Sequence, residues 1–367
     1  MKVLEVIAGP IRVDGIQTFV TQIIKNLDSS ICIDCLTPLT YMNGDLKNAL
    51  SARGGNLFTF EFKASDINGW YKPLYAFFKE NPYDVIHING STIQQLATIA
   101  AATKCQKSAK IIVHSHLTGT RYNPAIHLYR SIASLSMRKY VDVYCACSKE
   151  AAAWKFTRKY QKQTHIITNG IETDRFLFDQ KRRNAIRESL NISDTEFVLG
   201  NVGRLCENKN QFFTLSVFEE LLKVKPDSKL ILVGDGPDRS ALEDKVSKKG
   251  LSERVVFTGI TEDVPGYLMA MDAFILPSKH EALGFAVIEA QASGLPVVAS
   301  DSLPDLVKIN DSVIFLPLGE RNIPKWVVAI LHVKHYAREE GVDKVKNAEF
   351  DIEHTIKQVE RLYRSTC

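Results

Sequence analysis

Short runs rich in valine and isoleucine recur along this 367-residue chain, and each is followed by a turn and then by a helix-length segment. The first half contains VLEVI, DVIHI, AKIIVH and VDVYCA, and the second half contains FVLGNV, SKLILVG, RVVFTG, AFILP and PVVAS. Apolar runs that alternate with helical segments are typical of parallel sheets with helices on both faces. The sequence therefore predicts an α/β protein with two doubly wound sheets in tandem.

The length also favours two domains, since one domain takes about 150 residues. Near residue 170 an apolar strand gives way to a charged, loop-like segment, and we place the boundary there. The domains are then residues 1–170 and 171–350. Residues 351–367 are predicted to form a terminal helix whose apolar stripe is Ile352, Ile356, Val359 and Leu362.

Composition excludes several classes of protein. The hydrophobic and charged fractions, 45% and 24%, are those of a globular protein, and no window approaches the roughly 18 apolar residues of a membrane span. Glu5 interrupts the first apolar run, which argues against a signal peptide. A net charge of +4 without a block of like charges does not indicate nucleic-acid binding. We therefore expect a cytoplasmic protein.

The seven cysteines predict neither a disulfide framework nor a metal site. An odd number in a long chain without a secretory signal fits a reducing compartment. Cys32 and Cys35 lie in a strand-like stretch, where a spacing of three directs the two sulfurs to opposite faces. Cys145 and Cys147 can share a face, but no second pair at ligand spacing accompanies them. We expect buried, small apolar residues.

Two stretches of the first half carry candidate site residues, because ligands of open parallel sheets bind beyond the carboxyl ends of the strands. Gly15 precedes an apolar-periodic helix, whose first backbone amides suit a phosphate or a sugar; a plain connecting turn gives the same pattern. His114 and His116 share one face at the end of another strand. His116 is a candidate for binding a substrate hydroxyl, with a structural histidine as the alternative.

In the second half, GRLCENKNQ follows the strand FVLGNV. Gly203 allows a turn, and Arg204 and Lys209 lie in the loop that opens a helix, where cations and a helix N-terminus suit a pyrophosphate. Two surface cations are the ordinary alternative. Gly234 begins GDGPDR, which matches only the start of the dinucleotide motif G-x-G-x-x-G, because Arg239 replaces the third glycine.

Two glutamates with seven residues between them follow the strand AFILP. Glu281 is expected in a loop and Glu289 about a turn and a half into a helix over residues 284–293. Glu281 can then bind ligand hydroxyls at the sheet edge, and Glu289 can bind a second diol nearby. Sugars offer such pairs of hydroxyls. Nothing fixes the roughly 5 to 9 Å separation of a hydrolase pair. Two solvated glutamates are the alternative.

In order and spacing, GRLCENKN, LILVGDGPDR, TGI and SKHEALGFAVIEAQASGLPVVASD resemble the retaining GT-B glycosyltransferases of family 4, and more narrowly bacterial enzymes of exopolysaccharide or capsule assembly. DGIQTFV, VHSH and TNGIETDRF extend the resemblance over the first half. It implies two Rossmann-like domains facing across a cleft, with the acceptor bound by residues 1–170 and the nucleotide sugar by residues 171–350. Residues 351–367 would cross back to the first domain. A UDP-sugar donor, no metal and no other cofactor are implied.

The resemblance also implies roles for single residues. Arg204 and Lys209 match the cations that bind the donor diphosphate. Glu281 matches the glutamate that contacts the donor sugar, and Glu289 the one that holds the ribose. His116 resembles the histidine that faces the reacting sugar, and with Glu281 and the two cations it forms the predicted catalytic set. The predicted donor-binding set is Gly15, Gly203, Arg204, Lys209, Gly234, Gly259, Glu281, Ala282, Leu283, Gly284 and Glu289.

Three positions depart from the family pattern. Ala282 and Leu283 stand where glycine and an aromatic residue are usual, which is expected to reshape the sugar pocket. Asp305 stands where the family often has a glutamate.

The expected acceptor is a glycan or a polyprenyl-linked sugar at the inner face of the cell membrane. Two segments mix lysine and arginine with Tyr129, Tyr140, Trp154 and Phe156. This composition suits an anionic membrane surface, but on these residues alone ordinary solvated helices explain it better. Other functions stay open: an isomerase like UDP-N-acetylglucosamine 2-epimerase, a non-catalytic partner of another transferase, and a nicotinamide dehydrogenase, which the missing third glycine disfavours.

Overall fold

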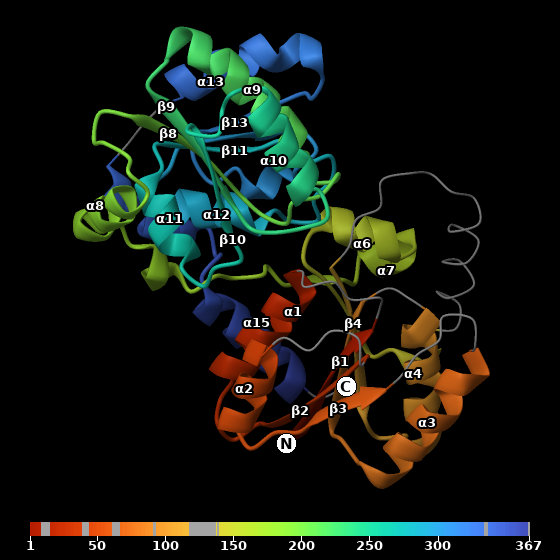
Figure 1. Ribbon diagram of the computed structural model, residues 1–367. Helices are drawn as coiled ribbons and strands as arrows, with labels where there is room; N and C mark the ends of the chain where they lie inside the picture. Colours follow the sequence, from red (N-terminus) through yellow and green to blue (C-terminus); the bar gives the residue numbers. More distant parts are fainter. Residues whose placement is uncertain are drawn as a thin grey trace. The chain divides into compact units, whose positions relative to one another are not determined.

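The computed structural model describes residues 1–8, 15–38, 44–60, 67–90, 93–116, 137, 139–333 and 337–365. The chain divides into two compact units, one of Met1–Gly170 with Ile352–Cys367 and one of Ile171–Asp351 (Figure 1). Each unit contains one parallel sheet with helices around it, so the predicted α/β class with two doubly wound sheets is confirmed.

The first unit has its strands in the order β3-β2-β1-β4-β5-β6-β7. The strands are β1 (Lys2–Ala8), β2 (Cys32–Pro38), β3 (Leu57–Phe60), β4 (Val85–Gly90), β5 (Lys110–Ser115), β6 (Val143–Ala146) and β7 (His165–Ile166). The described helices are α1 (Gly15–Asn26), α2 (Gly44–Ala52), α3 (Ile67–Glu80), α4 (Ile93–Cys105), α6 (Lys149–Lys155), α7 (Arg158–Gln161) and α15 (Ile352–Arg364).

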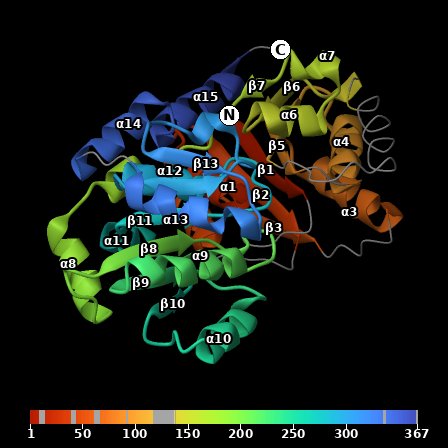
Figure 2. The same ribbon diagram turned by 90° about the horizontal axis from the view of Figure 1, so that it is seen from above.

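Helices α1, α2 and α15 cover one face of this sheet, and α3 and α4 lie on the other (Figures 1 and 2). The strands alternate, so Val3 and Ile7 of β1 point into the same core as α1. The stripe of α15 is buried there, with Leu362 only partly covered. Tyr363, which the stripe did not include, is also buried.

The cysteines of the described ranges are free. Cys32 is exposed and Cys35 buried on β2, as a strand period of two predicts, and Cys145 and Cys147 are buried. Within those ranges the structure contains no helix of the length and apolarity that crossing a bilayer requires.

The second unit has the strand order β10-β9-β8-β11-β12-β13. The strands are β8 (Phe197–Val202), β9 (Ser228–Val233), β10 (Val255–Gly259), β11 (Ala273–Leu276), β12 (Val297–Ser300) and β13 (Val313–Leu316). The α-helices are α8 (Gln180–Ser189), α9 (Gln211–Val224), α10 (Arg239–Lys248), α11 (Val264–Ala270), α12 (Phe285–Ala292), α13 (Ile323–His332) and α14 (Gly341–Asn347). The 3-10 helices are η1 (Thr173–Phe176), η2 (Asp305–Val307), η3 (Glu320–Asn322) and η4 (Arg338–Glu340).

Two apolar layers bury the two faces of this sheet. On one side α9, α10 and α13 pack on Leu199 and Leu232, and Trp326 of α13 is fully buried there (Figure 1). On the other side α11, α12 and α14 pack on Val198 and Phe274. Because the inner strands β8, β9, β11 and β12 are buried on both faces, the unit needs the continuous apolar runs seen in the sequence.

Candidate functional site

The strand order of the second unit reverses between β8 and β11. Strand β8 is followed along the chain by β9 on one side, whereas β11 pairs with β8 on the other side. Ligands of open parallel sheets bind in the crevice at such a switch point, beyond the carboxyl ends of the strands. Residues 203–210 leave β8 and residues 277–284 leave β11, so these two loops flank the crevice.

Hydrogen bonds tie the two loops together. The Asn208 side-chain nitrogen donates to the carbonyl oxygen of His280 at 2.9 Å, and the backbone amide of Lys279 donates to the Asn208 carbonyl at 2.7 Å. Lys209, the next residue, forms an ion pair with Glu281. Their side chains are 23% and 12% exposed, so the pair is largely enclosed and still accessible to a ligand.

Glycines allow the neighbouring loops to approach closely. Gly234 has φ +128°, and a Cβ at this position would lie 2.2 Å from the Gly203 carbonyl oxygen. The Gly234 amide donates to the Gly259 carbonyl at 3.0 Å. The aliphatic stem of Lys209 lies over Gly203, with its Cε 3.6 Å from where a Cβ would be. The glycine of GDG therefore packs the loop after β9 against the loop after β8.

Glu289 lies in α12, whose N-cap Gly284 has φ +90°. Glu289 is half-buried as a residue, and its carboxylate accepts no hydrogen bond from the residues that the structure describes. Burial raises the pKa of Glu289 to about 7, against the positive charges of Arg175 and Lys209. Near neutral pH, part of the Glu289 carboxyl is therefore protonated. Ligand hydroxyls that donate hydrogen bonds to it would favour the ionised carboxylate.

Arg175 is a further candidate site residue, which the sequence patterns did not single out. It lies in η1, donates to the Glu262 carbonyl at 3.1 Å, and contributes positive charge at Glu289. The available signal was its place in TNGIETDRF, just beyond an apolar strand.

Other predicted donor residues also lie at this edge. Arg204 is half-buried, and its guanidinium forms no ion pair within the described ranges, which leaves it available to an anion. Leu283 is 3% exposed and belongs to the apolar core, so only its backbone can contact a ligand. Asp305, at the start of η2, is exposed.

Gly15 and His116 belong to the first unit. Gly15 is the first residue of α1, and Phe19, one turn further, packs on His116 with 4.8 Å between ring centroids. His116 follows β5 directly and is buried. The helix start and the histidine are thus adjacent within this unit. Tyr129, one of the aromatic residues of the predicted membrane-facing segments, lies outside the described residues.

The predicted membrane-facing segment is corrected at two positions. Phe156 is buried and packs edge-on against Tyr144, with 5.2 Å between centroids. Lys155 is buried as well, where it donates to the backbone carbonyls of Gly90 and His114. Neither side chain is available to a surface, because the core of the unit uses both. Tyr140 is exposed and Trp154 half-buried.

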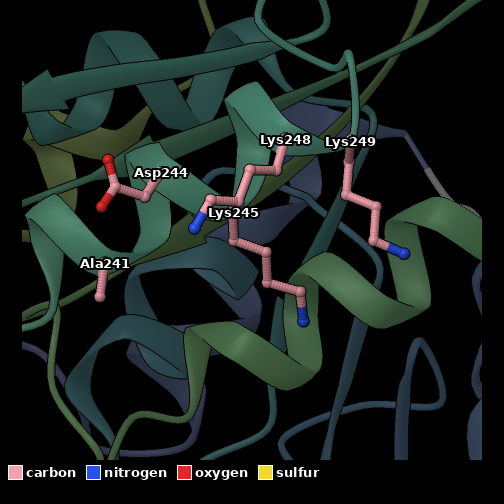
Figure 3. Close-up of a pocket in the computed structure, with 5 residues that line it drawn as sticks. All are labelled: Ala241, Asp244, Lys245, Lys248 and Lys249. Carbon is pink, nitrogen blue, oxygen red and sulfur yellow. The ribbon is translucent and has the colours of Figure 1, made fainter.

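A shallow hollow of about 400 Å³ lies on α10 and contains none of the predicted site residues; Figure 3 shows its lining, Ala241, Asp244, Lys245, Lys248 and Lys249. The lysine ammonium groups point in different directions (Figure 3). Lys249 pairs with Glu219 at 3.1 Å, and the Lys245 ammonium lies 5.6 Å from the centroid of the Phe212 ring. The hollow is therefore a surface feature of one helix and no part of the candidate site.

Solved structures and family models identify this arrangement. The structure of Anabaena HepE in complex with UDP and glucose aligns over the whole of both chains, with a TM-score of 0.77 and 18% identity. A glycosyltransferase from Rickettsia africae aligns over 99% of this chain and 97% of its own, with a TM-score of 0.78 and 16% identity. The family model Glycosyltransferase Family 4 matches residues 13–175, and the model Glycosyl transferases group 1 matches residues 182–312. The chain belongs to the GT-B glycosyltransferases of family 4.

Curated relatives of this glycosyltransferase agree with the family. Glycosyltransferase EpsF of Bacillus subtilis is 28% identical over 315 residues, which are 83% of this chain and 80% of EpsF. An Escherichia coli enzyme named UDP-Gal:alpha-D-GlcNAc-diphosphoundecaprenol alpha-1,3-galactosyltransferase is 25% identical over 233 residues, 62% of this chain and 60% of that enzyme. The activity of this glycosyltransferase is therefore sugar transfer from a nucleotide-sugar donor.

Proposed function

We propose that this glycosyltransferase moves a sugar from a UDP-sugar to a glycan or lipid-linked acceptor in exopolysaccharide or capsule synthesis, with retention of configuration and without a divalent metal. The observation that carries the proposal is the Lys209–Glu281 pair at the switch point of the second sheet. It combines a cation for a leaving diphosphate with an acid for sugar hydroxyls. The UDP in the HepE complex supports a uridine nucleotide as the donor.

Departure of UDP develops negative charge on its phosphate. Lys209 and Arg204, fixed in one short loop, stabilise that charge without a metal ion. Glu281 then accepts hydrogen bonds from the donor sugar. In the proposed retaining reaction the acceptor hydroxyl attacks from the face that UDP leaves, and the leaving phosphate takes the proton, so no protein nucleophile is assigned.

The names of the relatives support a lipid-linked acceptor. The Escherichia coli enzyme acts on a diphosphoundecaprenol-linked sugar, and another relative is the Vi polysaccharide biosynthesis protein VipC/TviE of Salmonella typhi. Lys149, Arg158 and Lys159 on α6 and α7 are exposed and offer positive charge to an anionic membrane surface. We therefore also propose that the protein binds peripherally to the inner face of the membrane.

The test is nucleoside diphosphate release by the purified protein over a panel of UDP-, GDP- and ADP-sugars, with and without membrane extract and with EDTA. We expect one UDP-sugar to give nucleoside diphosphate release that depends on an acceptor. This release should persist in the presence of EDTA and should be lost in the Glu281→Ala variant. Conversion of the donor sugar without acceptor and without free UDP would replace the proposal with an isomerase. No binding and no turnover of any donor would favour a non-catalytic partner.

The affinity for UDP is expected to rise with pH through about 7, because an ionised Glu289 accepts both ribose hydroxyls and the protonated form does not. The raised pKa also has a stability consequence. The folded apo-protein holds this proton more tightly than the unfolded chain, so the Glu289 contribution to stability is present below the ordinary glutamate pKa and is lost as the pH rises through about 7. Calorimetric titration of UDP across this range measures the affinity.

Glu289→Gln is the control for this pH dependence, because an amide does not titrate. The phosphate of UDP also loses a proton over this pH range, but this changes its affinity for both proteins in the same way. The wild-type affinity should therefore rise more steeply than that of the variant. Parallel pH profiles would show that Glu289 is not the titrating group.

A further inference from the structure

The first unit buries a group of polar side chains that donor binding does not explain. They are Glu5 of β1, His87 and Asn89 of β4, His114 of β5 and His116 just after it, and all are buried. Glu5 pairs with His87 across neighbouring strands, and Asn89 with His114. Side chains on the same face of adjacent strands lie close enough to interact. Burial of a carboxylate is costly unless its oxygens are hydrogen-bonded.

Glu5 accepts hydrogen bonds on both oxygens. Its Oε1 lies 3.0 Å from His87 Nδ1 and accepts from the Tyr363 hydroxyl. Its Oε2 accepts from Asn89 Nδ2 at 2.6 Å. Tyr363 belongs to α15, so a residue near the end of the chain completes the environment of a strand that begins at its second residue.

Asn89 connects Glu5 to His116, and the orientation of its side-chain amide determines which nitrogen of His116 carries the hydrogen. Since Asn89 Nδ2 donates to Glu5, its Oδ1 faces His116 Nε2, at 2.9 Å. A carbonyl oxygen only accepts, so His116 Nε2 must carry the hydrogen. Burial, with the charge of Lys155 nearby, holds the pKa of His116 well below its ordinary value, and the ring is neutral. Its Nδ1 therefore bears a lone pair.

That lone pair has no partner in the described part of the chain, although Nδ1 is fully buried. The ring itself is held in place: Phe19 packs on it, and His114 lies against it with 4.0 Å between centroids. A buried, unpaired acceptor costs free energy that a bound hydroxyl recovers. The geometry favours a donor group such as a sugar hydroxyl.

We propose that Glu5 and Asn89 are positioning residues that hold His116 as the tautomer protonated at Nε2, so that Nδ1 accepts a hydrogen bond from a substrate hydroxyl. The second half of this inference rests on the proposed function; the first half does not. In the opposite tautomer His116 would present a donor at Nδ1 and could bind the same hydroxyl only through its oxygen. We call the chain of hydrogen bonds from Glu5 through Asn89 to His116 the polar relay. It requires the substrate hydroxyl to be the hydrogen-bond donor to Nδ1.

Nuclear magnetic resonance of the full chain with ¹⁵N-labelled histidine tests the tautomer without any substrate. The His116 signals are assigned by their loss in His116→Gln. We expect a protonated Nε2 and a bare Nδ1 in the wild type and in Asn89→Asp, whose protonated carboxyl still donates to Glu5 while its other oxygen accepts from Nε2. Asn89→Leu removes that acceptor and should give a mixture of both tautomers. A wild-type ring protonated at Nδ1 would overturn the relay whatever the activity.

Two substitutions of His116 test the acceptor role in the transfer assay. His116→Asn places an amide oxygen where Nδ1 was, whereas His116→Gln keeps a donor toward Asn89 and loses that acceptor. We expect kcat/KM to be about tenfold higher for His116→Asn than for His116→Gln, the worth of one hydrogen bond. Equal rates would remove the role of Nδ1. His165→Gln, at an exposed position on β7, is the matched control and should match the wild type.

Discussion

Replacing Lys209 by methionine is expected to lower kcat/KM by about 10²- to 10³-fold, the usual loss when one preorganised group that stabilises transition-state charge is removed. Lys209 is enclosed beside Glu281 at the switch point, and its stem lies over Gly203. Methionine keeps much of that stem and removes the charge. The measurement is nucleoside diphosphate release with the donor that the panel identifies.

Lys279→Met is the control for this substitution, since Lys279 belongs to the facing loop and pairs with Glu207 at 2.9 Å, with side chains 40% and 88% exposed. A surface pair of this kind contributes little, so its removal should change the rate less than about twofold. The double variant Lys209→Met with Glu281→Gln separates two causes. If it is as active as Glu281→Gln alone, the loss in Lys209→Met came from an unpaired Glu281 and the cationic role of Lys209 is wrong.

The fold was predictable because burial on both faces requires continuous apolar strands, and such runs are visible in the sequence. The pairing of Lys209 with Glu281 was not predictable from periodicity. These residues are 72 positions apart, and they meet because β11 lies next to β8, an order that hydrophobic patterns do not encode. Each residue was recognisable as a candidate because it follows a strand and because it matches a motif of the family.

Composition alone was a poor guide to surfaces. Lys155 and Phe156 have the residue types of a membrane-binding helix, yet hydrogen bonds to strand-end carbonyls and an aromatic contact place both inside the unit. The polar relay had one sequence signal, a glutamate in the middle of the apolar run VLEVI. A buried carboxylate requires partners, but the sequence could not show that one partner, Tyr363, lies at the other end of the chain.

The largest stability effect is expected at Arg187 of α8, whose side chain is 1% exposed. Its guanidinium donates to the carbonyls of Ser193 at 2.6 Å, Glu196 at 2.5 Å and Ala270 at 3.0 Å, and to the Asp272 carboxylate at 3.3 Å. Arg187→Ala would leave the buried Ala270 carbonyl without this donor and would remove one partner from the partly covered oxygens of Ser193, Glu196 and Asp272. Removal of one partner from such a network costs about 3–5 kcal/mol of unfolding free energy.

Denaturant unfolding measures this loss in the second unit. Trp326 is the one tryptophan of residues 171–351, so its fluorescence reports on that unit in a background with Trp70→Phe and Trp154→Phe. Arg182→Ala is the matched control on α8. Arg182 pairs with Asp263 and is 40% exposed, and its loss should cost less than about 1 kcal/mol.

Arg187→Met separates hydrogen bonding from packing, because methionine fills much of the space of the arginine stem and donates nothing. If the unpaired carbonyls dominate, this variant should be nearly as unstable as Arg187→Ala. If it recovers most of the lost stability, the volume of the side chain matters more than its hydrogen bonds, and the network contributes little to the stability of the second unit. The difference between the two variants thus measures what the buried guanidinium contributes beyond its volume.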